Sequence, residues 1–238
     1  MGRRNSFVLK RLVLGLFFAF LSVKAGKEWM SGDTLRHLFL ACALVGIASL
    51  LRLPKIVSNQ GNDKARGRWF ADVVCLVYGL APFLLNALFK PMHWMTTLAD
   101  TASWLTSSSG IFSVFLAPVV EEYFFRGWLL NGQRTLYEPP QSETESTGSR
   151  WLMLCYTNAL FFWALHAPFD WSVWKLALSD GKMPMSLGPF FLGLVTCALT
   201  LFSGSLRPAI VFHLLANALG PVWQPLLSSE TLRSVFYN

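Results

Sequence analysis

Two adjacent glutamates and a nearby arginine lie within an apolar stretch that we expect to cross a bilayer. Glu122 and Arg126 are four residues apart, so on a helix they share a face and can form an ion pair. Glu121 lies about 100° round the helix from Glu122 and needs a partner from another helix. Charged groups at membrane depth cost about 2.5–3.5 kcal/mol on insertion scales, which makes them candidates for function. The alternative is a purely structural ion-pair cluster.

Three further polar side chains lie in later apolar segments. His166 ends one segment, and His213 and Asn217 share a face of another, four residues apart. Taken singly, a transmembrane His or Asn more often joins helices by a hydrogen bond than performs chemistry. Taken together with Glu121, they supply what a water-activating hydrolytic site needs. Such a site uses a carboxylate base, an orienting imidazole and donors for an oxyanion.

The same residues form three motifs whose order resembles that of a known family. The motifs are Glu121-Glu122-x-x-x-Arg126, Phe162-x-x-x-His166 and His213-x-x-x-Asn217. This set is similar to the CAAX protease and bacteriocin-processing family, also called the Abi family. Its members are intramembrane proteases related to the type II CAAX prenyl endopeptidase. The resemblance covers about residues 110–220, and residues 1–100 show no useful likeness.

The resemblance implies a role for each residue of the motifs. Glu121 corresponds to the catalytic glutamate, and His166 would help it to activate water. His213 and Asn217 would stabilise the oxyanion of the tetrahedral intermediate. Three further residues complete the motifs, and we expect them to support the site: Glu122, Arg126 and Phe162.

Metal dependence is open within this family, whose members have been described both as metalloproteases and as metal-independent glutamic proteases. The sequence favours the second description. It contains neither HExxH nor a pair of cysteines at CxxC spacing. His-x-x-x-Asn is a poor zinc pair because a neutral amide oxygen is a weak zinc ligand. We therefore expect no cofactor, with a divalent metal such as zinc as the alternative.

The composition is typical of a polytopic membrane protein. Of the 238 residues, 53% are hydrophobic and only 14% are charged. A net charge of +7 would suggest nucleic acid in a soluble chain, but no nucleic-acid-binding motif is present. Basic residues also crowd the cytoplasmic loops of membrane proteins. We therefore expect the lipid bilayer and a membrane-associated protein or peptide as partners, with no nucleic acid. Oligomeric state is left open.

The predicted fold class is all-α, a polytopic transmembrane helical bundle with about seven spans. The expected apolar segments are residues 12–23, 37–51, 71–89, 110–130, 151–166, 187–202 and 208–220. Polar loops are predicted at 52–70 and 131–150, and a short interfacial or re-entrant helix at 171–178. The predicted domains are N-terminal transmembrane helices at 1–105, a catalytic helical core at 106–226 and a tail at 227–238.

Charge asymmetry predicts the orientation of the chain. The N-terminus and the 52–70 loop hold nine Lys and Arg residues, against four in the 24–36 and 90–110 loops. The positive-inside rule then predicts an integral protein of the cell (inner) membrane with a cytoplasmic N-terminus. The predicted ends of the apolar segments place two of the site residues at different depths in the bilayer. Measured from Trp151, His166 would lie about 22 Å into the bilayer, whereas Glu121 would lie about 13 Å from Leu130.

The predicted function is an intramembrane endopeptidase that hydrolyses a peptide bond of a membrane-associated substrate by glutamate-activated water. Two alternatives belong to other classes. One is a non-enzymatic membrane protein of the same fold, such as a bacteriocin-immunity or scaffold protein, and the other is a small proton-coupled transporter. A scaffold has no need of all four polar residues, and a transporter would more often show paired half-repeats. A prenylated tail, a bacteriocin leader and a sorting tail all remain possible substrates.

Overall fold

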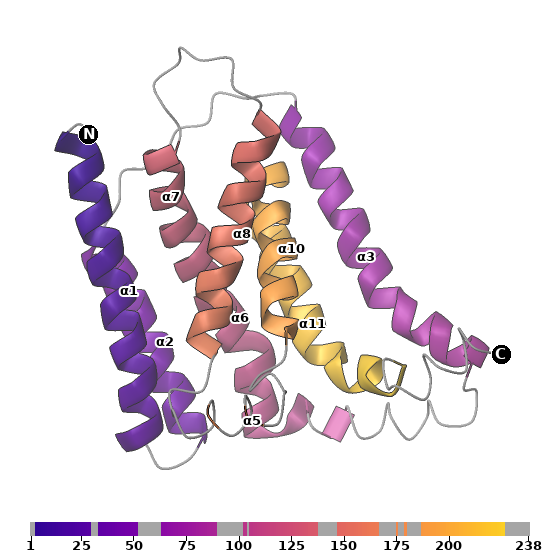
Figure 1. Ribbon diagram of the computed structural model, residues 1–238. Coiled ribbons are helices and arrows are strands. Elements are labelled where there is room, and N and C mark those ends of the chain that lie inside the picture. The colour runs from indigo at the N-terminus through magenta and orange to yellow at the C-terminus, as the bar shows by residue number, and fades with distance from the viewer. Residues whose placement is uncertain are drawn as a thin grey trace.

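The computed structural model describes residues 3–29, 33–51, 63–89, 102–103, 105–137, 147–166, 175, 179 and 187–226. Within these residues every regular element is helical, so the predicted all-α bundle is confirmed (Figure 1). Three helices come first: α1 (Arg3–Trp29), α2 (Asp33–Leu50) and α3 (Asp63–Phe89). The middle of the chain forms α5 (Ser108–Ile111), η1 (Phe112–Leu116), α6 (Ala117–Glu122), η2 (Tyr123–Leu129) and α7 (Leu130–Tyr137). The last helices are α8 (Thr147–His166), α10 (Gly188–Ser203) and α11 (Arg207–Leu226).

The segment from α5 to α7 is one helical rod that contains two π-helical stretches. The residues at the junctions keep right-handed helical dihedral angles, so the chain does not turn between the elements. In the π stretches the backbone bonds reach five residues back, as from the N–H of Leu130 to the carbonyl of Phe125. Each π turn rotates the side chains that follow it to a different face of the helix. Such bulges occur frequently at functional sites.

The first π stretch leaves one backbone carbonyl without a donor on its own helix. The N–H of Ala117, the α-helical partner of the Ser113 carbonyl, instead donates to the carbonyl of Phe112. The next residue is Pro118, which has no N–H to offer. The Ser113 oxygen must therefore find its partner elsewhere.

Several helices extend beyond the apolar segments that predicted them. Residues 63–70, 131–137 and 147–150 are helical, so the predicted polar loops were too long, and α11 passes Gly220 to end at Leu226. Polar residues form helix readily once a neighbouring apolar face is packed. The helix predicted at 171–178 lies outside the described residues except for Lys175, and the predicted tail at 227–238 lies wholly outside them.

The core gathers around the aromatic side chains of η2. Phe124 stacks on Trp128 with ring centroids 5.1 Å apart, and Phe125 meets Phe162 of α8 edge-on at 4.9 Å. All four rings are at least 95% buried. The first two helices pack on this cluster, and the indole N–H of Trp128 donates to the carbonyl of Leu51 at 2.8 Å. This packing holds the rod that carries both glutamates.

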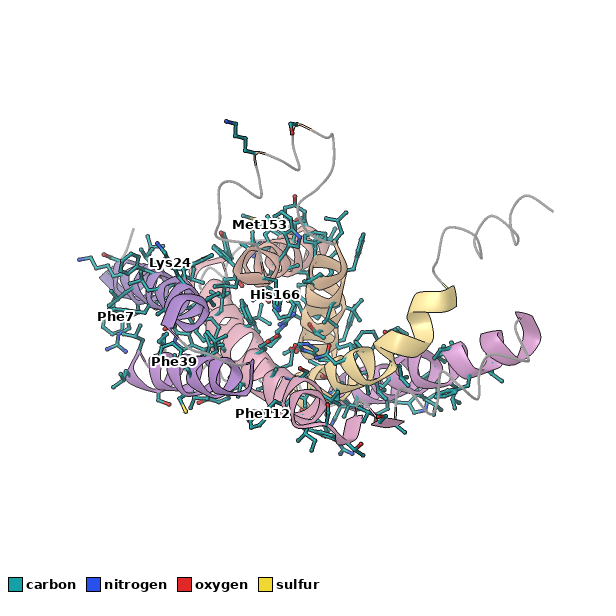
Figure 2. All side chains as sticks on the ribbon, turned by 90° about the horizontal axis from the view of Figure 1, so that it is seen from below. Phe7, Lys24, Phe39, Phe112, Met153 and His166 are labelled. Atoms are coloured by element: carbon teal, nitrogen blue, oxygen red, sulfur yellow. The ribbon has the colours of Figure 1, made fainter. Side chains whose placement is uncertain are left out.

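On the other flank, α10 packs closely on α8, and α3 packs on α10 and α11. A Cβ atom added to Gly193 of α10 would lie 3.0 Å from the Cα of Ala159, so the two backbones approach more closely there than a larger residue allows. On α3, Ala71 and Cys75 are buried against Leu199 and Phe212. Figure 2 views the assembled helices from below, with His166 among the central ones.

Within the described residues, two helical stretches are long and apolar enough to cross a membrane, Asn5–Ala25 and Gly67–Leu84. Phe39–Leu50 and Gly188–Ser203 are shorter apolar helices. Large apolar side chains are exposed on the outer faces of α1, α3 and α8. They include Phe7, Val13, Phe17, Leu76, Val77, Leu80, Leu152 and Met153. Contact with lipid gives such exposed apolar faces a favourable environment. The predicted number of about seven spans stays a prediction.

Candidate active site

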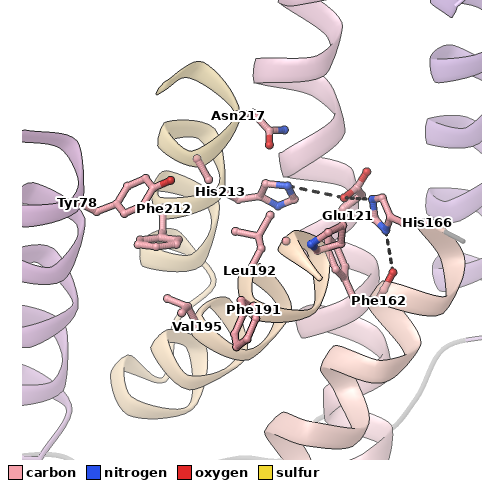
Figure 3. Close-up of a pocket in the computed structure, with 13 residues that line it drawn as sticks. Tyr78, Glu121, Phe162, His166, Phe191, Leu192, Val195, Phe212, His213 and Asn217 are labelled. Atoms are coloured by element: carbon pink, nitrogen blue, oxygen red, sulfur yellow. Dashed lines mark hydrogen bonds and ion pairs between the residues drawn. The ribbon is translucent and has the colours of Figure 1, made fainter. Parts of the chain in front are cut away.

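Glu121 lies where three helices converge, at the end of α6. Its Oε2 atom is 3.8 Å from Nε2 of His166 on α8 and 3.8 Å from Nε2 of His213 on α11. Figure 3 shows the carboxylate between the two imidazole rings. The side chain of Glu121 is 21% exposed and that of His166 is 37% exposed, so both reach open space. The partner that Glu121 lacks on its own helix is therefore supplied by two other helices.

The expected mismatch in depth between His166 and Glu121 does not occur. The rod that carries Glu121 continues to Tyr137, which places the glutamate 16 residues, or about 24 Å, from that end. His166 lies 19 residues, or about 29 Å, from the start of α8 at Thr147. Both helices are longer than the apolar segments that predicted them, and the two side chains lie 3.8 Å apart.

The orientation of His166 follows from its place at the end of α8. Its Nδ1 atom lies 2.7 Å from the carbonyl of Phe162, which is one turn earlier on the same helix. A carbonyl only accepts, so Nδ1 carries the proton in this contact. Nε2 of the neutral ring is then the acceptor, and this atom faces Glu121.

Glu122 is buried completely and holds two partners. Its Oε1 atom lies 2.9 Å from Nδ1 of His213, and its Oε2 atom lies 3.2 Å from Nε of Arg126. The predicted pair between Glu122 and Arg126 is therefore confirmed. The sequence did not show that His213 would contact Glu122, because that contact joins residues 91 positions apart.

Arg126 also connects this cluster to α8 and α10. Its Nη2 atom donates to the carbonyl of Gly193 at 3.1 Å, and its guanidinium lies 4.6 Å above the ring centre of Phe162. The side chain of Arg126 is fully buried, as is Glu122. A buried ion pair needs such extra partners to offset the loss of water. Phe162, expected to support the site, thus lies against Arg126 and also contacts both imidazole rings.

The side chain of Asn217 is held by the Ser113 carbonyl, which the first π stretch leaves without a donor on its own helix. Its Nδ2 atom donates to the carbonyl of Ser113 at 2.8 Å. A side-chain amide nitrogen carries two hydrogens, so this bond leaves one of them for another acceptor. Asn217 also lines the same cavity as Glu121 and His213. The four residues predicted as catalytic therefore meet at one place.

A polar network that the sequence analysis missed supports the second π stretch. Asn158, which is completely buried, donates to the carbonyl of Phe125 and to Oε1 of Gln133, both at 3.0 Å. Gln133 in turn donates to the hydroxyl of Thr157 at 3.2 Å. Asn158, Phe162 and His166 follow one another at intervals of four residues. That spacing on one helix face was the signal that could have revealed Asn158.

The cavity at this site has a volume of about 580 Å³ and two unlike parts. Its polar side consists of the four predicted catalytic residues. Its other side is apolar and comes from α3, α10 and α11, with Tyr78, Phe191, Leu192, Val195 and Phe212 among its lining residues. The cavity thus joins the four polar residues to an apolar surface formed by three helices.

Across the part of the chain described by the structure, no group of three or more His, Cys, Asp or Glu residues is arranged to hold a metal ion. The carboxylate of Glu121 lies 3.8 Å from one ring nitrogen of His166 and from one of His213. The expectation of a cofactor-free site therefore stays a prediction.

Comparison with known proteins identifies the family. Residues 102–219 match the family described as type II CAAX prenyl endopeptidase Rce1-like, and this range includes all seven residues of the three motifs. A search of curated proteins and a search of solved structures each gave no match. Proteins of the matched family are embedded in membranes. The match supports the assignment of this chain to the CAAX-type intramembrane proteases. The chain thus belongs to the CAAX protease family, among the type II CAAX prenyl endopeptidase Rce1-like proteins.

Proposed function

We propose that this protein is an intramembrane endopeptidase in which Glu121 activates water for attack on a peptide bond. One observation carries the proposal: Oε2 of Glu121 lies 3.8 Å from Nε2 of two imidazoles that come from different helices. A gap of 3.8 Å is too long for a direct hydrogen bond, but a bridging water suits it. The groups around that gap are those that hold and deprotonate a nucleophilic water.

His166 and Glu121 would accept the two hydrogens of this water. The Nδ1 proton of His166 is used by the carbonyl of Phe162, so Nε2 is the atom left to accept. Oε2 of Glu121 accepts the second hydrogen and takes that proton during attack. A lone pair of the water then points into the cavity, where the carbonyl carbon of the substrate would lie.

The reaction then proceeds through two proton transfers. The water oxygen bonds to the carbonyl carbon while Glu121 takes a proton, and the carbonyl oxygen becomes an oxyanion. The second Nδ2 hydrogen of Asn217 and a protonated Nε2 of His213 are the proposed donors to that oxyanion. When the C–N bond breaks, the proton on Glu121 passes to the leaving amine. The carboxylate is restored, and no other reactant is consumed.

The proposed donor role of His213 requires protons on both ring nitrogens, because Nδ1 faces a carboxylate oxygen of Glu122. Glu121 and Glu122 each carry a negative charge when ionised, and Arg126 supplies one positive charge. One proton on His213 would make the cluster neutral, which lowers the cost of holding it in a region of low dielectric. Nε2 would then donate rather than accept, as an oxyanion requires.

The proposed substrate is a membrane-associated protein or peptide. The apolar side of the cavity supports this proposal, because it would hold an apolar group of the substrate close to Glu121. Prenylated tails, bacteriocin leaders and sorting tails remain the candidate substrates. We also propose that the protein acts in the cell (inner) membrane with its N-terminus in the cytoplasm, as its charge distribution indicates.

A metal-assisted hydrolysis is the second candidate, and one observation favours it. Each imidazole uses Nδ1 for a carbonyl or a carboxylate and directs Nε2 towards Glu121. Histidines that bind metals are commonly held in this way by their second nitrogen. The two mechanisms share the same residues and differ in their response to a chelator.

The experiment measures peptide cleavage by purified wild-type protein and by Glu121→Gln, both in lipid nanodiscs. The peptides are anchored in the membrane and represent the three candidate substrate classes. Wild type should cleave at least one class, and Glu121→Gln should lose cleavage while keeping the wild-type melting temperature. Asp72→Asn, a change at an exposed carboxylate on α3, is the control that should keep full activity. Undiminished cleavage by Glu121→Gln would refute the proposal. Absence of cleavage of all three classes by wild type would favour the non-enzymatic alternative.

A further inference from the structure

One wall of the active-site cavity comes from a helix outside the family match. The matched region begins at residue 102, whereas α3 spans Asp63–Phe89. Tyr78 of α3 nevertheless lines the same cavity as Glu121. Figure 3 shows Tyr78 at one end of the lining residues and His166 at the other. The cavity thus extends from the catalytic groups to a helix that the family motifs do not include.

The residues between these two ends are apolar. Phe191, Leu192 and Val195 of α10 and Phe212 of α11 line this part of the cavity, which we call the apolar arm. The ring of Tyr78 lies against the ring of Phe212, with centroids 4.5 Å apart. Phe212 directly precedes His213, so an occupant of the apolar arm would extend away from the catalytic histidine towards Tyr78.

Tyr78 is held in place by the packing of α3. One turn before it, Cys75 is buried and its thiol donates to the carbonyl of Pro208 on α11 at 3.5 Å. Next to it, a Cβ atom added to Gly79 would lie 3.6 Å from Leu215 of α11, which is ordinary contact distance. These contacts fix the position of α3 beside α11, and the Tyr78 ring packs there against Phe212.

We propose that Tyr78 is a specificity-determining residue that closes the apolar arm and sets the longest apolar group of a substrate that can reach Glu121. The inference rests on the proposed endopeptidase function. Its physical basis is steric. A group that fits the apolar arm gains burial, whereas a longer group must displace a packed aromatic ring, and overpacking is costly.

The test uses a ladder of peptides that are identical except for the length of an n-alkyl thioether on one cysteine. For wild type, kcat/KM should rise with length and then fall beyond a limit. Tyr78→Ala should move this limit to longer chains and raise kcat/KM for the first rejected peptide by about tenfold or more. Tyr78→Trp should move the limit to shorter chains. Tyr78→Phe, which keeps the ring, should leave the limit where it is.

Two control variants lie on the same helix but outside the cavity. Leu76 and Val77 are about 60% exposed, so Leu76→Ala and Val77→Ala should leave the profile of the ladder unchanged. If Tyr78→Ala cleaves the ladder with the wild-type length limit, the inference is wrong even though the protease assignment stands. A shift caused by Tyr78→Phe alone would also overturn it, because the hydroxyl rather than the ring would then decide.

A binding measurement separates this inference from the proposed function. The same peptides, labelled with a fluorophore, are bound to Glu121→Gln and to Glu121→Gln with Tyr78→Ala. The double variant should bind the longer peptides more tightly than the single variant. If wild type cleaves no peptide and this difference in binding persists, the proposed function fails while the length limit stands. Equal affinities of the two variants across the ladder would count against the role of Tyr78.

Discussion

Nδ1 of His213 lies 2.9 Å from Oε1 of Glu122, and this contact links the helix of the paired glutamates to α11. Nε2 on the opposite side of the same ring faces Glu121. Glu122 therefore holds the imidazole that we propose to stabilise the oxyanion. The two adjacent glutamates act on the same histidine from opposite sides of its ring, one as a fixed support and one at the cavity.

Replacing Glu122 by Gln should destabilise the protein, and Arg126→Met should do the same. Each change leaves a buried charge without its partner, at a typical cost of about 3–5 kcal/mol in the free energy of unfolding. Thermal unfolding in detergent measures this loss. The combined change Glu122→Gln with Arg126→Met should lose less than the two single losses added together, since neither charge is then left alone.

Glu121→Gln is the matched comparison for these variants. The side chain of Glu121 is 21% exposed, and its two ion-pair contacts with described residues are both 3.8 Å long, so the variant should melt near the wild-type temperature. Glu121→Gln should thus lose activity while keeping its stability, whereas Glu122→Gln should lose stability first. If Glu122→Gln is well folded but inactive while Glu121→Gln still cleaves, the roles of base and support are reversed.

Asn217→Ala should slow turnover without weakening substrate binding. Loss of one oxyanion donor typically lowers kcat by about 10²–10³, and KM should change little. Steady-state kinetics on any cleaved peptide measure the two constants separately. A large rise in KM with kcat preserved would instead make Asn217 a substrate-binding residue.

The same variant should also cost stability, because the carbonyl of Ser113 loses its donor. Pro118→Ala supplies a backbone N–H five residues beyond that carbonyl. In a Pro118→Ala background, Asn217→Ala should therefore lower the melting temperature less, while the loss of kcat stays as large. Equal losses of melting temperature in both backgrounds would show that Pro118 does not control this carbonyl.

Chelation should leave activity intact if Glu121 and water suffice. Protein dialysed against a strong chelator, with metal content measured by mass spectrometry, should cleave at the rate of untreated protein. Heat-treated protein and a zinc protease assayed in parallel serve as controls. Complete loss of activity that zinc restores would favour the metal-assisted mechanism and make His166 and His213 candidate ligands.

Gly193→Ala should perturb the site through packing alone. The added Cβ would lie 3.0 Å from Cα and 3.1 Å from Cβ of Ala159, so α8 and α10 must separate slightly. Overpacking of this kind costs about 1–3 kcal/mol. The shift also moves the carbonyl that Arg126 binds, and activity should fall with stability. Gly46→Ala on α2, where a Cβ meets nothing within 4 Å, should be neutral or slightly stabilising.

The sequence alone was sufficient to predict the helical fold class, the three motifs and one contact within the site. The pair of Glu122 and Arg126 could be predicted because four residues on a helix always span about one turn. The positions of the helical segments followed from their apolar runs. Their ends did not, because the helices at Asp63, Tyr137 and Leu226 extend into polar sequence or past a Gly-Pro step.

Only the tertiary structure decided which polar groups meet across helices. His213 reaches Glu122, Asn217 reaches the carbonyl of Ser113, and Asn158 reaches that of Phe125. The last two contacts involve carbonyls within or at the π stretches, where the backbone bonds shift by one residue and side chains turn to new faces. Pro118 accounts for the missing donor to the Ser113 carbonyl, but the sequence analysis did not predict the shift itself. It arises where the helices pack, because packing decides which irregular turns can be stabilised by a side chain from a neighbouring helix.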